Sequence, residues 1–128
     1  MICASTRWPR TNVSPRYVSQ TPQGEEIEAY IAGGIITHAG LAFSRDGKEK
    51  SYIQHKMGQD KAMLAKMLTA ENEADKAYFY LCGPTWPVPD VYEALVGSLT
   101  ENAGKSRENA EEYMDELKEA ERYVLEVY

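Results

Sequence analysis

The chain ends in RYVLEVY, residues Arg122–Tyr128, where apolar and polar side chains alternate as they do along a β-strand, and the final strand is predicted at Tyr123–Val127. Termini are usually polar and frayed, so a final strand that closes on an aromatic residue is unusual. A second strand is predicted at Ala77–Leu81, before CGP at 82–84, and a third at Ala39–Phe43, before SR at 44–45. Open α/β sheets bind ligands at the carboxyl ends of their strands. We therefore expect the trailing residues of the three strands to share one crevice.

Helices are predicted between these strands from apolar side chains at helical spacing. The predicted helices are 25–32, 52–68 with an interruption near Gly58, one that starts near Pro89 and Asp90, and one capped by Ser106. In the third of these, Val91, Leu95 and Leu99 form the apolar stripe. The middle strand is apolar throughout, as expected for a strand covered on both faces. The order β-α-β-α-α-β indicates an α/β fold with a parallel sheet.

The composition restricts the class of protein. The chain has 128 residues, 43% hydrophobic and 27% charged, which is typical of one globular domain. A net charge of −6 argues against nucleic acid as a partner, and no apolar run is long enough to span a membrane. With only two cysteines, a structural disulfide is not expected, and a reducing, cytoplasmic location fits. No metal site is expected, because Cys3, His38, His55 and Cys82 lack ligand spacing.

Residues 1–23 differ from the rest of the chain. They hold three arginines, three prolines and no acidic residue, whereas all 20 acidic residues lie in 24–128. An acid-free segment rich in Arg and Ser is typical of an organellar transit peptide. The prolines oppose the amphipathic helix of such a peptide and favour a disordered tail that is foreign to the domain. We therefore place the domain at residues 24–128.

The first candidate site surrounds the end of the strand at 39–43. Ser44, Arg45, Lys50 and Tyr52 supply a hydroxyl, a guanidinium, an ammonium and a phenol. That set suits a dianionic phosphate such as the one that NADP(H) carries on its adenosine ribose, because Arg binds phosphate in a bidentate manner. The alternative is a solvated polar loop, since two acidic residues of the same loop dilute its charge.

Cys82 and Gly83 form the second candidate. Glycine lets a ligand approach the backbone closely, and a free thiol at a strand end can touch a cofactor. The alternative for Cys82 is a buried, small hydrophobic residue. Nearby, Trp86 is interpreted as a loop anchor and His55 as a hydrogen-bonding residue at a helix end.

Glu126 and Tyr128 form the third candidate, because alternation puts both on one face of the last strand. The carboxylate can accept a hydrogen bond or relay a proton, and the terminal ring can stack on a flat cofactor. The alternative is an aromatic residue at a strand end that packs against its own domain.

Together these segments resemble ferredoxin–NADP reductase-type modules, and among them the NADPH-dependent diflavin reductases. The resemblance covers residues 24–128 and rests on AFSR (42–45), KSYIQH (50–55), YLCG (80–83) and EVY (126–128). Each motif is weak alone, but four in family order and spacing are specific. The YIQH segment and the terminal Val-Tyr are most similar to the flavoprotein component of assimilatory sulfite reductase.

The resemblance implies a role for each candidate residue. Ser44, Arg45, Lys50 and Tyr52 would hold the 2′-phosphate and adenine end of NADPH. The catalytic group would be Cys82 beside the nicotinamide, Glu126 in the hydrogen-bond network of the reaction centre and Tyr128 over the flavin, with Gly83 also contacting the cofactor. Hydride would pass from NADPH to FAD, and electrons would then travel, through FMN in the full-length family, to a sulfite-reducing haemoprotein.

The sequence also departs from the family. It has no Arg-x-Tyr-Ser flavin-binding segment and no Gly-rich pyrophosphate loop, and Pro84 stands where some relatives carry an acid. The family's doubly wound sheet has the order 3-2-1-4-5, of which this chain would hold the three parallel strands 3, 4 and 5. We therefore expect the C-terminal half of a Rossmann-like NADP-binding domain with little turnover by itself. The alternatives are a non-catalytic NADP(H)-binding or interaction module, and a chain that does not fold alone.

Overall fold

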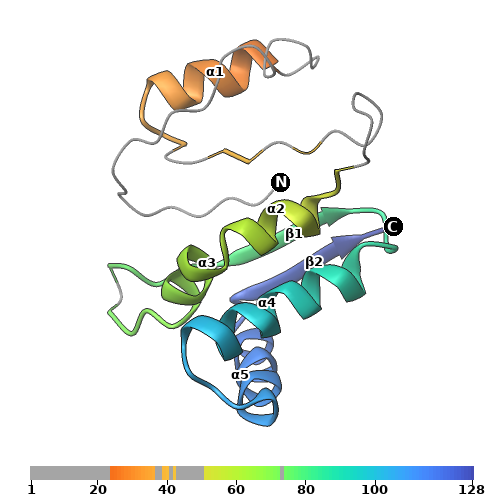
Figure 1. Cartoon of the computed structure of the whole chain (residues 1–128). Coiled ribbons are helices and arrows are strands. Elements are labelled where there is room, and N and C mark those ends of the chain that lie inside the picture. Colours follow the sequence, from red (N-terminus) through yellow and green to blue (C-terminus); the bar gives the residue numbers. More distant parts are fainter. Residues whose placement is uncertain (1–23, 37–38, 41, 43–50, 73) are drawn as a thin grey trace.

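The computed structural model describes residues 24–36, 39–40, 42, 51–72 and 74–128, which form five helices and two strands (Figure 1). In chain order these are α1 (Gly24–Ala32), α2 (Ile53–Gln59), α3 (Lys61–Leu68), β1 (Phe79–Gly83), α4 (Val88–Asn102), α5 (Arg107–Glu119) and β2 (Tyr123–Val127). The sequence predicted each of these elements, and β2 begins and ends at the predicted residues. No helix in this part of the chain is long and apolar enough to cross a membrane.

The two strands lie side by side and run parallel, as predicted (Figure 1). Phe79 pairs with Tyr123 at the start of the sheet, and Gly83 pairs with Val127 at its end. The helices α4 and α5 connect the two strands, and parallel neighbours need such a long crossover. The register brings the carboxyl ends of both strands to the same edge of the sheet.

One hydrophobic core joins α2, α3, α4 and α5 to a single face of this sheet. The predicted stripe of Val91, Leu95 and Leu99 on α4 has no exposed surface, and α4 packs against α2, α3 and α5. Phe79 and Leu81 of β1 are buried in the same core. Each fully buried side chain of this kind contributes about 1.5–3 kcal/mol to the hydrophobic stabilisation. The core therefore fixes β1 and β2 on the helical layer.

The opposite face of the sheet is open, which corrects the prediction that the middle strand is covered on both faces. Burial alternates along β1, and Tyr78 and Tyr80 are 46% and 40% exposed. The core helices pack on the face that carries Phe79 and Leu81, so the alternate side chains point away from them. The apolar composition of β1 indicated burial on both faces, but the described residues supply only one covering layer.

The third predicted strand, Ala39–Phe43 within the region 35–43, is not seen in its described residues, because 35–36, 39–40 and 42 have no strand conformation. Residues 37–38, 41 and 43 lie outside the described part. After α1 the chain turns back, and the N–H groups of Ile35 and Ile36 donate to the Tyr30 carbonyl at 2.9 and 3.1 Å. These donors are then not available to a strand ladder. The described residues therefore form an α/β fold whose parallel sheet has two strands instead of the predicted three.

The predicted interruption of the helix at 52–68 is confirmed, but it falls at Asp60 and not at Gly58. The Asp60 N–H donates to the Met57 carbonyl at 3.0 Å, and the Asp60 carbonyl accepts from the Leu64 N–H at 3.0 Å. Asp60 thus ends α2 and begins α3, so one amphipathic segment becomes two short helices against α4.

Ser106 caps α5 as predicted, because its hydroxyl oxygen accepts a hydrogen bond from the Asn109 N–H at 3.2 Å. Replacing Ser106 with alanine removes this acceptor and is expected to lower the free energy of unfolding by about 1 kcal/mol. Urea denaturation followed by circular dichroism measures the loss. Ser106→Asp retains a capping oxygen and should stay near the parent chain. An equal loss in both variants would show that the cap is not the cause.

Candidate functional site

Cys82 and Glu126 face each other near the carboxyl ends of β1 and β2. They are register partners, and the Cys82 Sγ lies 4.0 Å from the Glu126 Oε2. A thiol is a weak donor and a carboxylate accepts, so the S–H group donates to Glu126. Both residues are exposed, and Cys82 is a free thiol. Its interpretation as a buried hydrophobic residue is therefore wrong, and the pair is accessible to a ligand.

Tyr128 is held by its backbone while its side chain is exposed. Its N–H donates to the Gly83 carbonyl at 3.0 Å, and its carbonyl accepts from the Thr85 N–H at 3.2 Å. The residue is 88% exposed, so the alternative that its ring packs on its own domain is wrong. Gly83 has a φ of 142°, a backbone conformation that residues with a side chain rarely adopt. This conformation turns the chain from β1 into the loop that meets Tyr128. An exposed ring on an anchored backbone can stack on a flat ligand.

Tyr52, which precedes α2, contacts the loop that follows β1. Its ring centroid lies 5.4 Å from that of Trp86, and the two ring planes meet at 77°. On α2, the His55 Nδ1 accepts from the Tyr52 N–H at 3.3 Å, which confirms His55 as a hydrogen-bonding residue at a helix end. Trp86, interpreted from the sequence as an anchor, is 58% exposed. The sequence analysis did not place Trp86 beside a predicted site residue; the available signal was a large aromatic side chain in a proline-rich loop directly after a strand.

A side-chain hydrogen bond fastens α2 to the first turn of α4. The Gln54 Nε2 donates to the Asp90 Oδ2 at 3.0 Å, and Pro89 lies in the same turn, as predicted. The Asp90 carboxylate interacts favourably with the partial positive charge of this helix end. Because a carboxylate and a proline occupy the turn, it differs from the Gly-rich helix starts that bind phosphate through backbone N–H groups.

The structure thus brings together four of the predicted site residues at one edge of the sheet: Cys82, Gly83, Glu126 and Tyr128. The predicted phosphate-binding residues Ser44, Arg45 and Lys50 lie outside the described residues, so their arrangement stays a prediction. Tyr52, the fourth member of that set, reaches the loop after β1 through Trp86. Within the described ranges no group of three or more His, Cys, Asp or Glu side chains could hold a metal ion.

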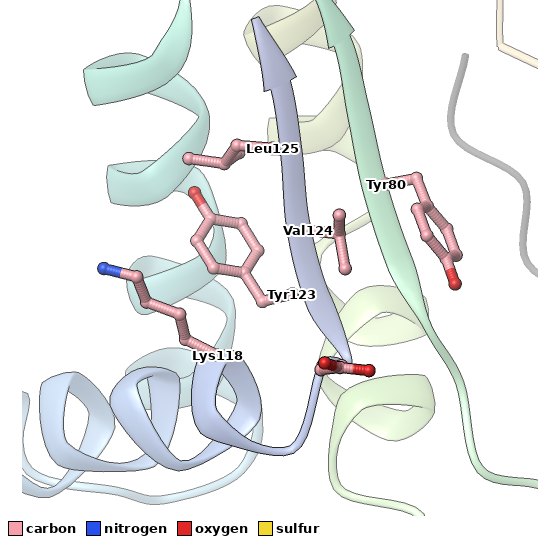
Figure 2. Close-up of a pocket in the computed structure, with 6 residues that line it drawn as sticks. Tyr80, Lys118, Tyr123, Val124 and Leu125 are labelled. Carbon is pink, nitrogen blue, oxygen red and sulfur yellow. The ribbon is translucent and has the colours of Figure 1, made fainter.

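A second surface feature lies beside the start of β2 (Figure 2). Figure 2 shows that Tyr123 and Leu125 point to one side of β2 and that Val124 points to the other. Burial raises the pKa of the Tyr123 hydroxyl, which has no hydrogen-bond partner among the described residues. The pocket has a volume of about 510 Å³ and is lined by Tyr80, Lys118, Glu121, Tyr123, Val124 and Leu125, none of them a predicted site residue.

Comparison with known proteins confirms the resemblance predicted from the four motifs, although no protein-family model matches the chain. The sulfite reductase [NADPH] flavoprotein component of Saccharomyces cerevisiae is 49% identical over 107 residues, which are 82% of this chain and 10% of that protein. A probable component from Schizosaccharomyces pombe is 41% identical over 105 residues, 82% of this chain and 10% of that protein. The alpha-component of Aliivibrio fischeri is 38% identical over 104 residues, with shares of 80% and 16%. The chain therefore spans less than a fifth of the length of these curated relatives.

Proposed function

We propose, from the homology of this chain to one segment of the sulfite reductase [NADPH] flavoprotein components, that it forms the NADPH-binding side of a flavoprotein oxidoreductase. The inherited reaction is hydride transfer from NADPH to FAD, with electrons passing on to a sulfite-reducing haemoprotein. The observation that carries the proposal is the grouping of Cys82, Glu126 and Tyr128 at the carboxyl edge of the parallel sheet. Open α/β sheets bind their ligands at this edge.

The side chains of this group fit the nicotinamide end of the cofactor. The exposed Glu126 carboxylate is an acceptor for a carboxamide N–H, and it also orients the Cys82 thiol, which donates to it across 4.0 Å. The Tyr128 ring is 88% exposed and offers an aromatic face for a flavin ring. The bound cofactors would supply the hydride and electron chemistry, whereas these side chains would position the rings.

A binding module without turnover is the second candidate function. The matched segment makes up 10% of the yeast protein and 16% of the bacterial one. The sequence also lacks a Gly-rich pyrophosphate loop and the Arg-x-Tyr-Ser flavin segment. Such a module would hold NADP(H) by its 2′-phosphate, or dock on a full-length reductase, without performing the hydride transfer.

An acceptor assay separates the two functions. The whole chain is mixed with NADPH, FAD and an artificial electron acceptor, and the rate is compared with that of free FAD under the same conditions. We expect NADP⁺ to bind in calorimetry and the chain to add little to the rate, because most flavin contacts are absent from this sequence. A substantial chain-dependent rate would instead show that the reaction centre is complete without further segments.

Arg45→Ala tests the predicted 2′-phosphate contact. We expect the affinity for 2′,5′-ADP to fall about tenfold or more, because a charge-assisted hydrogen bond contributes about 1.5–3 kcal/mol and 1.4 kcal/mol is a factor of ten. Calorimetry with the whole chain measures the loss. Lys48→Ala, in the same loop but outside the predicted set, is the matched control and should bind nearly as the parent chain does. If the parent chain itself does not bind 2′,5′-ADP, the proposed NADPH site is wrong.

A further inference from the structure

We infer that Trp86 is a further binding residue of the dinucleotide site, and that it forms with Tyr52 an aromatic corner for the adenine base. The inference rests on the proposed NADPH-binding function and extends it to a residue outside the family motifs. It starts from the contact of the two rings, whose centroids are 5.4 Å apart and whose planes meet at 77°. A flat base that stacks on one ring of such a pair meets the second ring at its edge, and both arrangements are favourable for aromatic rings.

The exposure of Trp86 supports a ligand-binding role. The residue is 58% exposed, whereas the aromatic residues Phe79 and Tyr123 are 3% and 6% exposed in the core. Its contact with Tyr52 leaves much of the indole open to solvent, and Tyr52 itself is only partly buried. An indole stacks on any nucleobase, because every base has a π-face. The pair therefore presents aromatic surface beside the strand end where the dinucleotide is proposed to bind.

Both rings are held by hydrogen-bonded backbone, so the corner is built before a ligand arrives. Tyr52 is fixed at the start of α2 by the bond from its N–H to the His55 Nδ1 at 3.3 Å. On the other side, the Thr85 carbonyl accepts from the Val88 N–H at 3.1 Å, which closes the turn that carries Trp86. The Gln54–Asp90 hydrogen bond of 3.0 Å then ties α2 to α4 and keeps the two parts together. A preorganised site binds with less loss of conformational entropy.

The position of the loop assigns the corner to adenine and not to nicotinamide. Residues 84–87 connect β1 to α4, and within them the Thr85 N–H donates to the Tyr128 carbonyl at 3.2 Å. One side of this loop therefore contacts the residue proposed for the nicotinamide and flavin end. Trp86, the next residue, contacts Tyr52, which belongs to the set predicted for the 2′-phosphate and adenine end. The loop thus lies between the two groups of predicted site residues, and the ring contact with Tyr52 assigns Trp86 to the adenine end.

The two tryptophans of the chain allow a direct test. Trp8→Phe leaves Trp86 as the only indole, so its emission reports on this position alone. We expect 2′,5′-ADP to quench that emission in the whole chain, and nicotinamide mononucleotide to leave it nearly unchanged. Quenching by the mononucleotide alone would place Trp86 at the opposite end of the cofactor and overturn the inference.

Calorimetry on Trp86 variants gives a second measurement. Trp86→Ala should weaken 2′,5′-ADP binding roughly tenfold, since one base–aromatic stack contributes about 1–3 kcal/mol. Trp86→Phe retains an aromatic face and should stay within about threefold of the parent chain. If Trp86→Ala binds as the parent chain does while Arg45→Ala binds weakly, the adenine corner is wrong and the proposed function stands. If the parent chain binds no 2′,5′-ADP, both are wrong.

Discussion

Replacing Arg122 with alanine is expected to lower the free energy of unfolding by about 3 kcal/mol, because two charge-assisted hydrogen bonds from a buried guanidinium are lost. Arg122 is 8% exposed; its Nε donates to the Ala77 carbonyl at 3.0 Å and its Nη2 donates to the Leu68 carbonyl at 3.1 Å. Those carbonyls belong to the end of α3 and to the approach to β1. In the variant the Ala77 carbonyl loses the guanidinium donor, whereas the Leu68 carbonyl still accepts from the Tyr113 hydroxyl at 2.9 Å. A buried carbonyl that loses its donor is unfavourable.

Urea denaturation of the two arginine variants Arg122→Ala and Arg107→Ala tests this role. Arg107 is exposed and forms ion pairs with Glu93 at 2.7 Å and Glu111 at 2.8 Å, so its removal should lower the urea midpoint much less than the loss of Arg122 does, because solvent screens exposed ion pairs. Arg122→Lys keeps the charge but lacks the planar guanidinium that reaches two carbonyls. Its urea midpoint should therefore lie between those of Arg122→Ala and Arg107→Ala. Equal midpoints for both alanine variants would show that the guanidinium of Arg122 is not a structural link.

The backbone of Arg122 also helps to set the register of β1 and β2. Its carbonyl accepts from the Phe79 N–H at 2.7 Å, which is the first hydrogen bond between the approaching strands. Because side chains alternate along a strand, this bond sets which residues of β1 and β2 stand opposite each other further along. With this register Cys82 pairs with Glu126. A shift of one residue would put one of the two side chains on the core face and separate the thiol from the carboxylate.

The sequence predicted those features that depend on local patterns. The alternation at Tyr123–Val127 is clear enough to place β2, and the burial of Leu95 and Leu99 follows from their helical spacing. The grouping of Cys82 with Glu126 follows from the rule that parallel strands end at the same edge. These predictions need no knowledge of how distant segments pack.

Predictions that depended on distant partners were less accurate. The apolar run at Ala39–Phe43 has the composition of a strand, but a strand forms only beside a neighbour that supplies hydrogen bonds. Tyr80 lies in an apolar strand, yet it is 40% exposed because only one face of the sheet is covered by described residues. The exposure of Trp86 likewise depends on the path of its loop, which composition does not reveal. Arg45 and its neighbours lie outside the described residues, so their role remains a prediction.

Gly83→Ala is expected to destabilise the fold by about 2 kcal/mol, because a φ of 142° is almost restricted to glycine and costs other residues roughly 1–3 kcal/mol. No atom lies within 4 Å of the position that the added Cβ would take, so the cost comes from the backbone and not from a collision. Relief of this strain rotates the peptide whose carbonyl accepts from the Tyr128 N–H at 3.0 Å. We therefore expect weaker NADP⁺ binding together with the loss of stability, measured by calorimetry and by thermal melting.

Gly58→Ala is the matched control for this change. Gly58 also has open space where an added methyl group would lie, but it is inside α2 and has no positive φ. Alanine loses less backbone entropy than glycine on forming a helix, so this variant should gain about 0.5–1 kcal/mol of stability. The two substitutions add the same methyl group to equally open sites, and they differ in the backbone conformation that receives it. A lower melting temperature for Gly83→Ala together with a higher one for Gly58→Ala would therefore trace the effect at Gly83 to its backbone conformation. A stabilised Gly83→Ala chain that still bound NADP⁺ would instead show that the turn after Cys82 tolerates side chains.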